Sequence, residues 1–173
     1  MALDDLKQLI RSIPDFPKPG IDFKDITTLL QNPDGFRESV DVLARRYENK
    51  KVDAIVAAEA RGFIFGGALA YKLGCGFVPV RKKGKLPYLT YEQTYDLEYG
   101  TDTIAIHQDA LKDGDRVVVC DDLLATGGTV AAIVELLGNF SIDVVEIAFL
   151  IELTFLNGRD KLPDLPVYAA LSF

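Results

Sequence analysis

The sequence has few of the residues that mark disulfide-bonded, metal-binding or histidine-based proteins. Its two cysteines, Cys75 and Cys120, lie far apart and form no CxxC pair. Each stands beside an apolar run, so we expect buried, reduced thiols rather than a disulfide or a metal site. The single histidine, His107, follows Ile106 in a predicted hairpin, and we expect it to be structural rather than a general base.

Long apolar runs are also missing. No stretch reaches the ~18 residues that a membrane-spanning helix needs, so no membrane association is predicted. The first residues, Met1 to Leu6, contain two acids and no basic segment followed by an apolar one. This pattern is not that of a signal peptide, and we therefore expect a cytoplasmic protein.

Positive charge is in deficit. Over 173 residues, 19 Lys and Arg stand against 26 Asp and Glu, a net charge of −7. An acidic surface repels phosphate backbones, so nucleic acid is not expected as a partner, although a local basic patch can still bind a small anion. With 49% apolar and 26% charged residues, the composition is that of an ordinary globular chain, and the length fits one domain.

Apolar runs of strand length alternate with segments of helical periodicity. Asn32 before Pro33 predicts a capped helix start, and Pro79 predicts an edge or a bulge in its strand. The alternation predicts an α/β fold whose sheet is mostly parallel, with helices on both faces. The expected helices are 3–13, 33 to about 47, 63–73 and 130–137, and the expected strands are 52–58, 77–80, 116–120, 144–151 and 167–171.

The segment 81–97 shows no clear periodicity. It opens with four cations in five positions, Arg81-Lys82-Lys83-Gly84-Lys85. An irregular stretch of this length inside a compact domain is typical of a lid, a binding loop or a disordered insert. Residues 95–99 and 103–107 resemble a β-hairpin that turns at Gly100-Thr101.

The most informative run is VVVCDDLLATGGT at 117–129, in which an apolar strand ends in two adjacent carboxylates, Asp121 and Asp122. In open α/β sheets ligands bind at the carboxyl ends of strands. Gly127 and Gly128 allow close backbone approach, and the start of the next helix favours an anion. The carboxylates suit sugar hydroxyls or Mg²⁺. The run therefore predicts a ligand with a phosphate at one end and a diol beside it, the shape of ribose 5-phosphate.

A plain β–α turn with a capped helix is the alternative interpretation of this run. It leaves the two adjacent acids unexplained, since they repel each other at the end of a buried strand. The run is not a P-loop, because no Lys follows its glycines, and it lacks the GxGxxG of a dinucleotide site.

Residues 117–129 resemble the phosphoribosyl-pyrophosphate motif of the type I phosphoribosyltransferases. The further segments FPKPGI (16–21), DIT (25–27), EARGFIFG (59–66), VRKKGKLP (80–87) and YDLEYG (95–100) resemble the adenine-specific members of that family. The resemblance implies the type I phosphoribosyltransferase fold in one domain over 1–173. That fold has a mostly parallel central sheet flanked by helices, a small N-terminal hood over about 1–34, and a flexible catalytic loop over about 82–97.

The resemblance also implies a reaction. Such enzymes transfer ribose 5-phosphate from 5-phosphoribosyl 1-pyrophosphate to adenine, giving AMP and pyrophosphate, which is a step of purine salvage. They use Mg²⁺ and form homodimers. The metal would be held mainly through the donor, with Asp121 and Asp122 as the residues that could contribute.

Site roles carry over by resemblance to the matching positions. Arg61 corresponds to a pyrophosphate contact, with a surface charge or helix-start residue as the alternative. The basic segment also contacts pyrophosphate, partly from the neighbouring subunit, with a solvated charge run as the alternative. The 5-phosphate is assigned to Ala125, Thr126, Gly127, Gly128 and Thr129, the ribose hydroxyls to Asp121 and Asp122, and the pyrophosphate to Arg61, Arg81, Lys82 and Lys85.

Four further residues are expected around the base. Glu98 matches a catalytic carboxylate that could share the proton adenine loses, or stabilise positive charge at the ribose; a solvent-facing hairpin residue is the alternative. Phe23 could stack on the purine or be a plain core aromatic, and Leu153 could pack on the other face. Lys24 stands where the family has Arg, and main-chain groups can still serve there. Glu98, Arg61 and Lys85 are the expected catalytic residues.

Three rival functions remain at this point. A transferase for hypoxanthine and guanine, xanthine or orotate is disfavoured by the GKLP and LEYG elements. A regulatory member of the fold that binds the donor and controls transcription or an RNA would need an added domain or a basic face. A generic nucleotide-binding module would leave Arg61, the basic segment and Glu98 as incidental.

Overall fold

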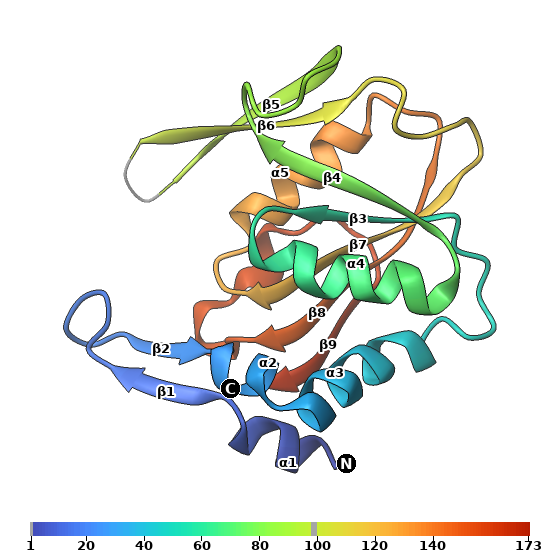
Figure 1. The fold of residues 1–173 in the computed structure, drawn as a ribbon. Helices are drawn as coiled ribbons and strands as arrows, with labels where there is room; N and C mark the ends of the chain where they lie inside the picture. The colour runs from blue at the N-terminus through green and yellow to red at the C-terminus, as the bar shows by residue number, and fades with distance from the viewer. Residues whose placement is uncertain (1, 98–99) are drawn as a thin grey trace. The chain divides into compact units, whose positions relative to one another are not determined.

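The computed structural model describes residues 2–97 and 100–173 (Figure 1). The chain forms two compact units, Met1–Val42 and Leu43–Phe173, and each is described by itself. Within the described ranges no helix has both the length and the apolar character to cross a bilayer.

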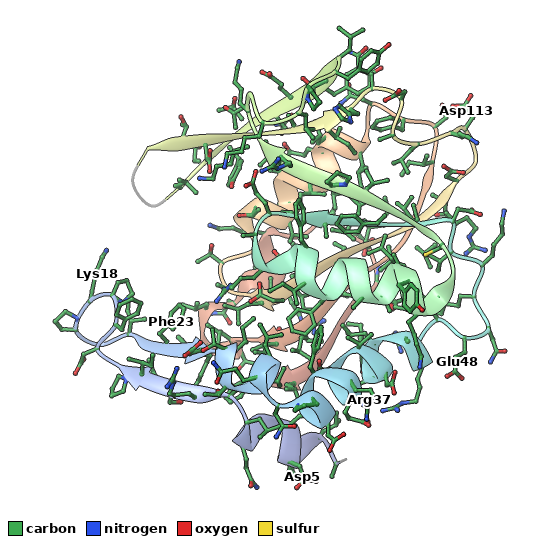
Figure 2. The ribbon with its side chains drawn as sticks, in the orientation of Figure 1. Asp5, Lys18, Phe23, Arg37, Glu48 and Asp113 are labelled. Carbon is green, nitrogen blue, oxygen red and sulfur yellow. The ribbon has the colours of Figure 1, made fainter. Side chains whose placement is uncertain are left out.

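The first unit contains a two-stranded antiparallel sheet. Its strands pair Ser12 with Lys24 and Ile13 with Phe23, and Figure 2 shows Lys18 on the loop that joins them. The elements are α1 (Leu3–Gln8), β1 (Arg11–Pro14), β2 (Asp22–Asp25), α2 (Thr27–Gln31) and α3 (Pro33–Arg45), the last of which continues into the second unit.

The predicted helix over 3–13 is wrong beyond Gln8. Residues 11–14 form β1 because β2 offers them a partner, and Arg11 adds an ion pair to Asp25 across the two strands. Pairing with β2 therefore determines the conformation of residues 11–14, although the apolar spacing along the sequence favours a helix there. The helix start at Asn32 is confirmed, since the Gly35 N–H donates to Asn32 Oδ1 at 2.9 Å.

The second unit is built on a seven-stranded sheet of order β5-β6-β4-β3-β7-β8-β9. The five strands from β4 to β9 run parallel, and the β5-β6 hairpin joins antiparallel at the β4 edge. The strands are β3 (Ala54–Ala58), β4 (Gly76–Lys82), β5 (Thr90–Asp96), β6 (Thr101–His107), β7 (Arg116–Leu124), β8 (Asp143–Glu152) and β9 (Val167–Ser172).

Helices cover both faces of this sheet, as predicted. Figure 1 shows α4 (Arg61–Leu73) in front of β3 and β7, and α5 (Gly128–Leu137) behind the sheet. All five residues of β3 are buried, as a strand covered on both sides requires. Gly74 ends α4 in the left-handed conformation at φ 68°, the predicted helix stop. Two short 3₁₀ turns, η1 (Thr154–Leu156) and η2 (Gly158–Lys161), follow β8.

Three strand predictions need correction. Residues 90–96 form β5, so the irregular segment after β4 is shorter than the sequence indicates; full pairing with β6 gives this polar stretch its regular structure. β4 is an interior strand, but it pairs with β6 only at Arg81 and Lys82, so Pro79 meets no ladder on that side. Asp121 and Asp122 lie within β7 rather than in the following loop, because pairing with β8 continues to Leu124.

Candidate active site

The candidate site forms where two neighbouring parallel strands end. β3 and β7 pair in register, with Ala57 opposite Cys120, so the residues that follow them come to the same edge of the sheet. Arg61 opens α4 just after β3, while Asp121 and Asp122 lie near the carboxyl end of β7. Arg61 Nε lies 3.0 Å from Asp122 Oδ2. Parallel topology thus joins an arginine and two acids that are 60 positions apart in the sequence.

The loop after β7 is a cradle for an anion. No side chain caps the start of α5, so its first backbone N–H groups are free of a capping acceptor. Gly127 holds φ at +81°, which turns the chain from strand to helix. Residues 125–129 line a cavity of about 90 Å³ together with Asp121. Uncapped N–H groups, hydroxyls and a helix dipole are the features that favour a phosphate.

A second and larger hollow adjoins this cradle. It has a volume of about 390 Å³ and shares Thr126, Gly128 and Thr129 with the first. The Tyr95 hydroxyl lies 3.3 Å from Thr129 Oγ1, which connects the β5-β6 hairpin to the cradle. Lys161 on η2 also lines this hollow, a residue that the sequence analysis missed because it lies far along the chain in an irregular turn.

The two acids are in direct contact with each other. The Asp122 N–H donates to Asp121 Oδ1 at 2.9 Å, and the Asp122 side chain is only 5% exposed. Burial and the charge of Asp122 raise the pKa of Asp121 well above its usual range. Burial also raises the pKa of Asp122, although Arg61 opposes that rise. A pair held in this way is stabilised by any positive charge or hydroxyl donor that approaches it.

Gly62 packs closely against the Asp121 carboxylate. A Cβ atom at this position would lie 2.7 Å from Asp121 Oδ1. The absence of a side chain therefore lets α4 start close beside β7. Gly62 belongs to the EARGFIFG segment, but no pattern along the sequence indicates this contact.

The basic segment converges on a carboxylate that the sequence analysis did not single out. Glu59 Oε1 accepts the Lys82 N–H at 2.8 Å and lies 3.3 Å from Arg81 Nε, and Glu59 Oε2 lies 3.3 Å from Lys85 Nζ. Burial opposes ionisation, but the hydrogen bonds from Lys82, Arg81 and Lys85 lower the pKa of Glu59. Lys82 Nζ instead lies 3.1 Å from Asp102 Oδ2. Each predicted pyrophosphate cation thus has an acidic partner within the chain.

The predicted base contacts fall in different parts of the molecule. Leu153 is 8% exposed, and its N–H donates to the Leu124 carbonyl at 3.0 Å, so it adjoins the end of β7. In the first unit Phe23 is partly buried, with its ring edge-on to Phe16 at 5.3 Å between centroids, and Lys24 Nζ contacts Ser12 Oγ at 2.7 Å. Figure 2 shows Phe23 on β2. Glu98 lies outside the described residues.

A magnesium ion would find only part of its coordination shell in the chain. Within residues 2–97 and 100–173, no group of three or more His, Cys, Asp or Glu side chains could enclose a metal. Asp121 and Asp122 are the available pair; Asp122 Oδ2 is in ion-pair contact with Arg61 but accepts no hydrogen bond among the described residues. Mg²⁺ commonly binds one or two carboxylates together with substrate phosphate oxygens and water. The residues present fit an ion that arrives with a phosphorylated ligand.

The parallel sheet, the phosphate cradle and the paired acids define a phosphoribosyltransferase domain. The model of the phosphoribosyl transferase domain family matches residues 25–166. The chain therefore belongs to the phosphoribosyltransferase family.

Within this family, the chain is similar to adenine phosphoribosyltransferases. The chain is 61% identical over 171 residues to the adenine phosphoribosyltransferase of Syntrophotalea carbinolica, covering 99% of this chain and 100% of that one. The crystal structure of adenine phosphoribosyltransferase from Thermoanaerobacter pseudethanolicus matches with a TM-score of 0.95 at 53% identity, over 99% of this chain and 100% of that one. The Saccharomyces cerevisiae enzyme, complexed with an iminoaltritol bisphosphate and adenine, matches with a TM-score of 0.92 at 42% identity, over 98% of each chain.

Proposed function

We propose that this chain transfers ribose 5-phosphate from 5-phosphoribosyl 1-pyrophosphate to adenine, giving AMP and pyrophosphate. The observation that carries the proposal is the meeting of the phosphate cradle with the acid pair and Arg61 at one edge of the sheet. The order of cradle, acid pair and arginine matches the donor, which has a phosphate, a diol and a pyrophosphate in sequence. The adenine-specific relatives support adenine as the acceptor.

The cradle positions the donor through its 5-phosphate. Uncapped N–H groups at the start of α5 and the hydroxyls of Thr126 and Thr129 donate to the phosphate oxygens. Asp121 and Asp122 accept hydrogen bonds from the ribose hydroxyls. Holding both ends of the sugar fixes its C1 carbon between the leaving group and the incoming base, and positioning of this kind lowers the barrier substantially.

The acid pair also suits the charge that develops at the ribose. Breaking the C1–O bond to pyrophosphate leaves positive character on the ring, while both bonding electrons depart with the pyrophosphate. Burial raises the pKa values of Asp121 and Asp122, because their ionised forms have lost solvating water, and the developing cation stabilises those ionised forms. The adenine ring nitrogen forms the new bond to C1 and loses a proton. We assign to Glu98 the role of sharing that proton.

The pyrophosphate is received by cations. Arg61, Arg81 and Lys85 each lie within 3.3 Å of a carboxylate oxygen, so they exchange an internal acid for the leaving group. Lys82 belongs to the same segment and stays close to Asp102. Magnesium, bound with the donor near Asp121 and Asp122, would supply further neutralisation of the phosphate oxygens.

We also propose that the chain acts as a homodimer. Tyr71 is 90% exposed on α4, and Ile64 lies seven residues before it on the same face. Phe77 on β4 adds a further partly exposed ring. A second copy of the chain would cover these apolar side chains. Light scattering should give twice the chain mass, and Tyr71→Asp should shift it towards the monomer; a monomeric parent would refute this part of the proposal.

The cysteines support a cytoplasmic setting for the enzyme. Both Cys75 and Cys120 are free thiols, and burial raises the pKa of Cys120. Unpaired thiols are typical of proteins in a reducing compartment.

The direct test is a parallel assay with four bases. The purified chain, Mg²⁺ and the donor are incubated with adenine, hypoxanthine, guanine or orotate, and products are separated by chromatography. AMP from adenine alone is the expected result. Turnover of a different base would refute the acceptor while keeping the donor site. Donor binding with no turnover of any base would favour a regulatory role.

A further inference from the structure

The phosphate cradle has no positive side chain of its own. Residues 121–129 contain two acids and neither Lys nor Arg. A phosphate monoester carries a charge of about −1.5 to −2 at neutral pH, whereas a helix start supplies only about +0.5. Asp121 and Asp122 add further negative potential beside it. The cradle as built from β7 and α5 therefore leaves much of the phosphate charge uncompensated.

Lys161 lies where its positive charge could offset the uncompensated negative charge of the phosphate. It lines the hollow of about 390 Å³ together with Thr126, Gly128 and Thr129, three of the five cradle residues. It is the one cation among the described residues that line either hollow of the cradle. Its side chain is exposed, and it forms no ion pair or hydrogen bond with the described part of the chain.

The turn that carries Lys161 is fitted directly to the cradle. A Cβ atom at Gly127 would overlap the Gly158 carbonyl oxygen, and one at Gly158 would overlap the Ala125 carbonyl oxygen. The backbones of η2 and the cradle loop therefore touch at two points where only glycine fits. Since Lys161 is three residues beyond Gly158 in the same short turn, its backbone position is set by the loop that holds the phosphate.

Hydrogen bonds from Arg159 also anchor η2, the turn that carries Lys161. Arg159 Nε and Nη2 donate to the two carboxylate oxygens of Glu152, each at 2.7 Å, and Arg159 Nη1 donates to the Val167 carbonyl at 3.1 Å. Glu152 is 8% exposed at the end of β8. The hydrogen bonds from Arg159 lower the pKa of Glu152 against the effect of burial. A two-pronged bond of this kind fixes orientation as well as charge.

We propose that Lys161 is a phosphate-binding residue whose ammonium group supplies the cation that the cradle lacks, and that Glu152 and Arg159 position it. The inference rests on the proposed function in that the phosphate is the 5-phosphate of the donor and of AMP. The phosphate site then has two parts. The loop after β7 supplies backbone dipoles, and the turn after β8 supplies a positive charge.

The test compares Lys161→Ala and Lys161→Arg with Lys112→Ala, an exposed lysine in the turn before β7. Titration calorimetry with ribose 5-phosphate should show affinity reduced about tenfold in Lys161→Ala, largely retained in Lys161→Arg, and unchanged in Lys112→Ala. The loss should shrink at high salt. Ribose, which lacks the phosphate, should bind all forms equally. Equal melting temperatures would show that the fold is intact.

Ribose 5-phosphate affinity within twofold of the parent in Lys161→Ala would overturn the inference. An equal loss in Lys112→Ala would also overturn it, because the effect would then be one of net charge. This probe contains no base and no pyrophosphate, so the result stands apart from the four-base assay. If the parent bound ribose 5-phosphate but formed no AMP, the proposed function would fail while Lys161 was still tested.

Discussion

The two regions proposed to bind anions obtain their positive potential in different ways. The loop at 125–129 uses backbone N–H groups, hydroxyls and a helix start. The region around Arg61, Arg81 and Lys85 uses full charges, each close to an internal carboxylate. Fixed dipoles cannot form an ion pair with an internal carboxylate, so they suit a group that stays attached through the proposed reaction. Paired cations can exchange one anion for another, which suits a group that leaves.

The largest expected effect comes from breaking the fixed region at Gly127. Gly127→Ala places a side chain at φ +81° and drives it into the Gly158 carbonyl, so the cradle must shift. Misplacement of about 1 Å costs about a hundredfold in catalysis, and we expect that loss in kcat/KM for the donor. Gly114→Ala is the matched control, since Gly114 has φ +82° with no atom within 4 Å. Comparable losses in both variants would attribute the effect to backbone strain rather than to the cradle.

A smaller effect is expected where the two regions meet, at Gly62. In Gly62→Ala the new methyl group would press on Asp121 Oδ1 and displace the acid pair. We expect kcat to fall about tenfold, as for a modest misplacement. Gly67→Ala on the same helix meets no atom within 4 Å and should instead stabilise the fold by about 0.5–1 kcal/mol. Steady-state assays and thermal melts on both variants measure the contrast, and unchanged kcat in Gly62→Ala would contradict it.

The exchange of partners in the charged region can be tested at Glu59. Glu59→Gln keeps an acceptor for the Lys82 N–H but removes the charge that competes for Arg81 and Lys85. Partly exposed ion pairs are each worth about 0.2–1 kcal/mol, so pyrophosphate should bind about threefold more tightly. Glu92→Gln, which frees Lys83 nearby, is the control and should have no effect. Weaker pyrophosphate binding in Glu59→Gln would mean that Glu59 positions the cations rather than competing for them.

The smallest expected effect is on the stability of the fold, which the ionised acid pair lowers. Because the pKa of Asp121 is raised in the folded protein, the folded state holds its proton more tightly than the unfolded one. Its ionisation therefore weakens the fold as the pH rises from 3.8 through the folded pKa. Asp121→Asn should raise the melting temperature at pH 8 by about 3 °C, and the gain should fade as the pH drops. Asp113→Asn, on an exposed turn, should change nothing; a gain independent of pH would contradict the account.

Local signals predicted the scaffold well. Asn32 and Pro33 marked the start of α3, Gly74 marked the end of α4, and buried apolar runs marked the parallel strands. Such signals depend on neighbours along the chain. The strands β1 and β2 and most of β5 were missed because their regularity comes from pairing between strands, and cross-strand pairing leaves little trace in a short polar segment.

Residue chemistry alone predicted the contiguous part of the candidate site, whereas distant residues such as Arg61 and Leu153 were named only through the family resemblance. The run at 117–129 carries its own chemistry, so the cradle and the acid pair could be inferred. The roles of Glu59, Glu152 and Lys161 depend on which strand ends lie side by side and on which turn touches the cradle. No spacing along the sequence encodes those contacts.

Transfer of ribose 5-phosphate to adenine is measured by following both products of one reaction. Donor labelled in the β-phosphate is incubated with the chain, Mg²⁺ and adenine, and AMP and labelled pyrophosphate are measured over time. The account predicts that the two appear in equal amounts and that neither forms without adenine. Release of pyrophosphate without AMP, or at a rate independent of adenine, would contradict transfer to the base.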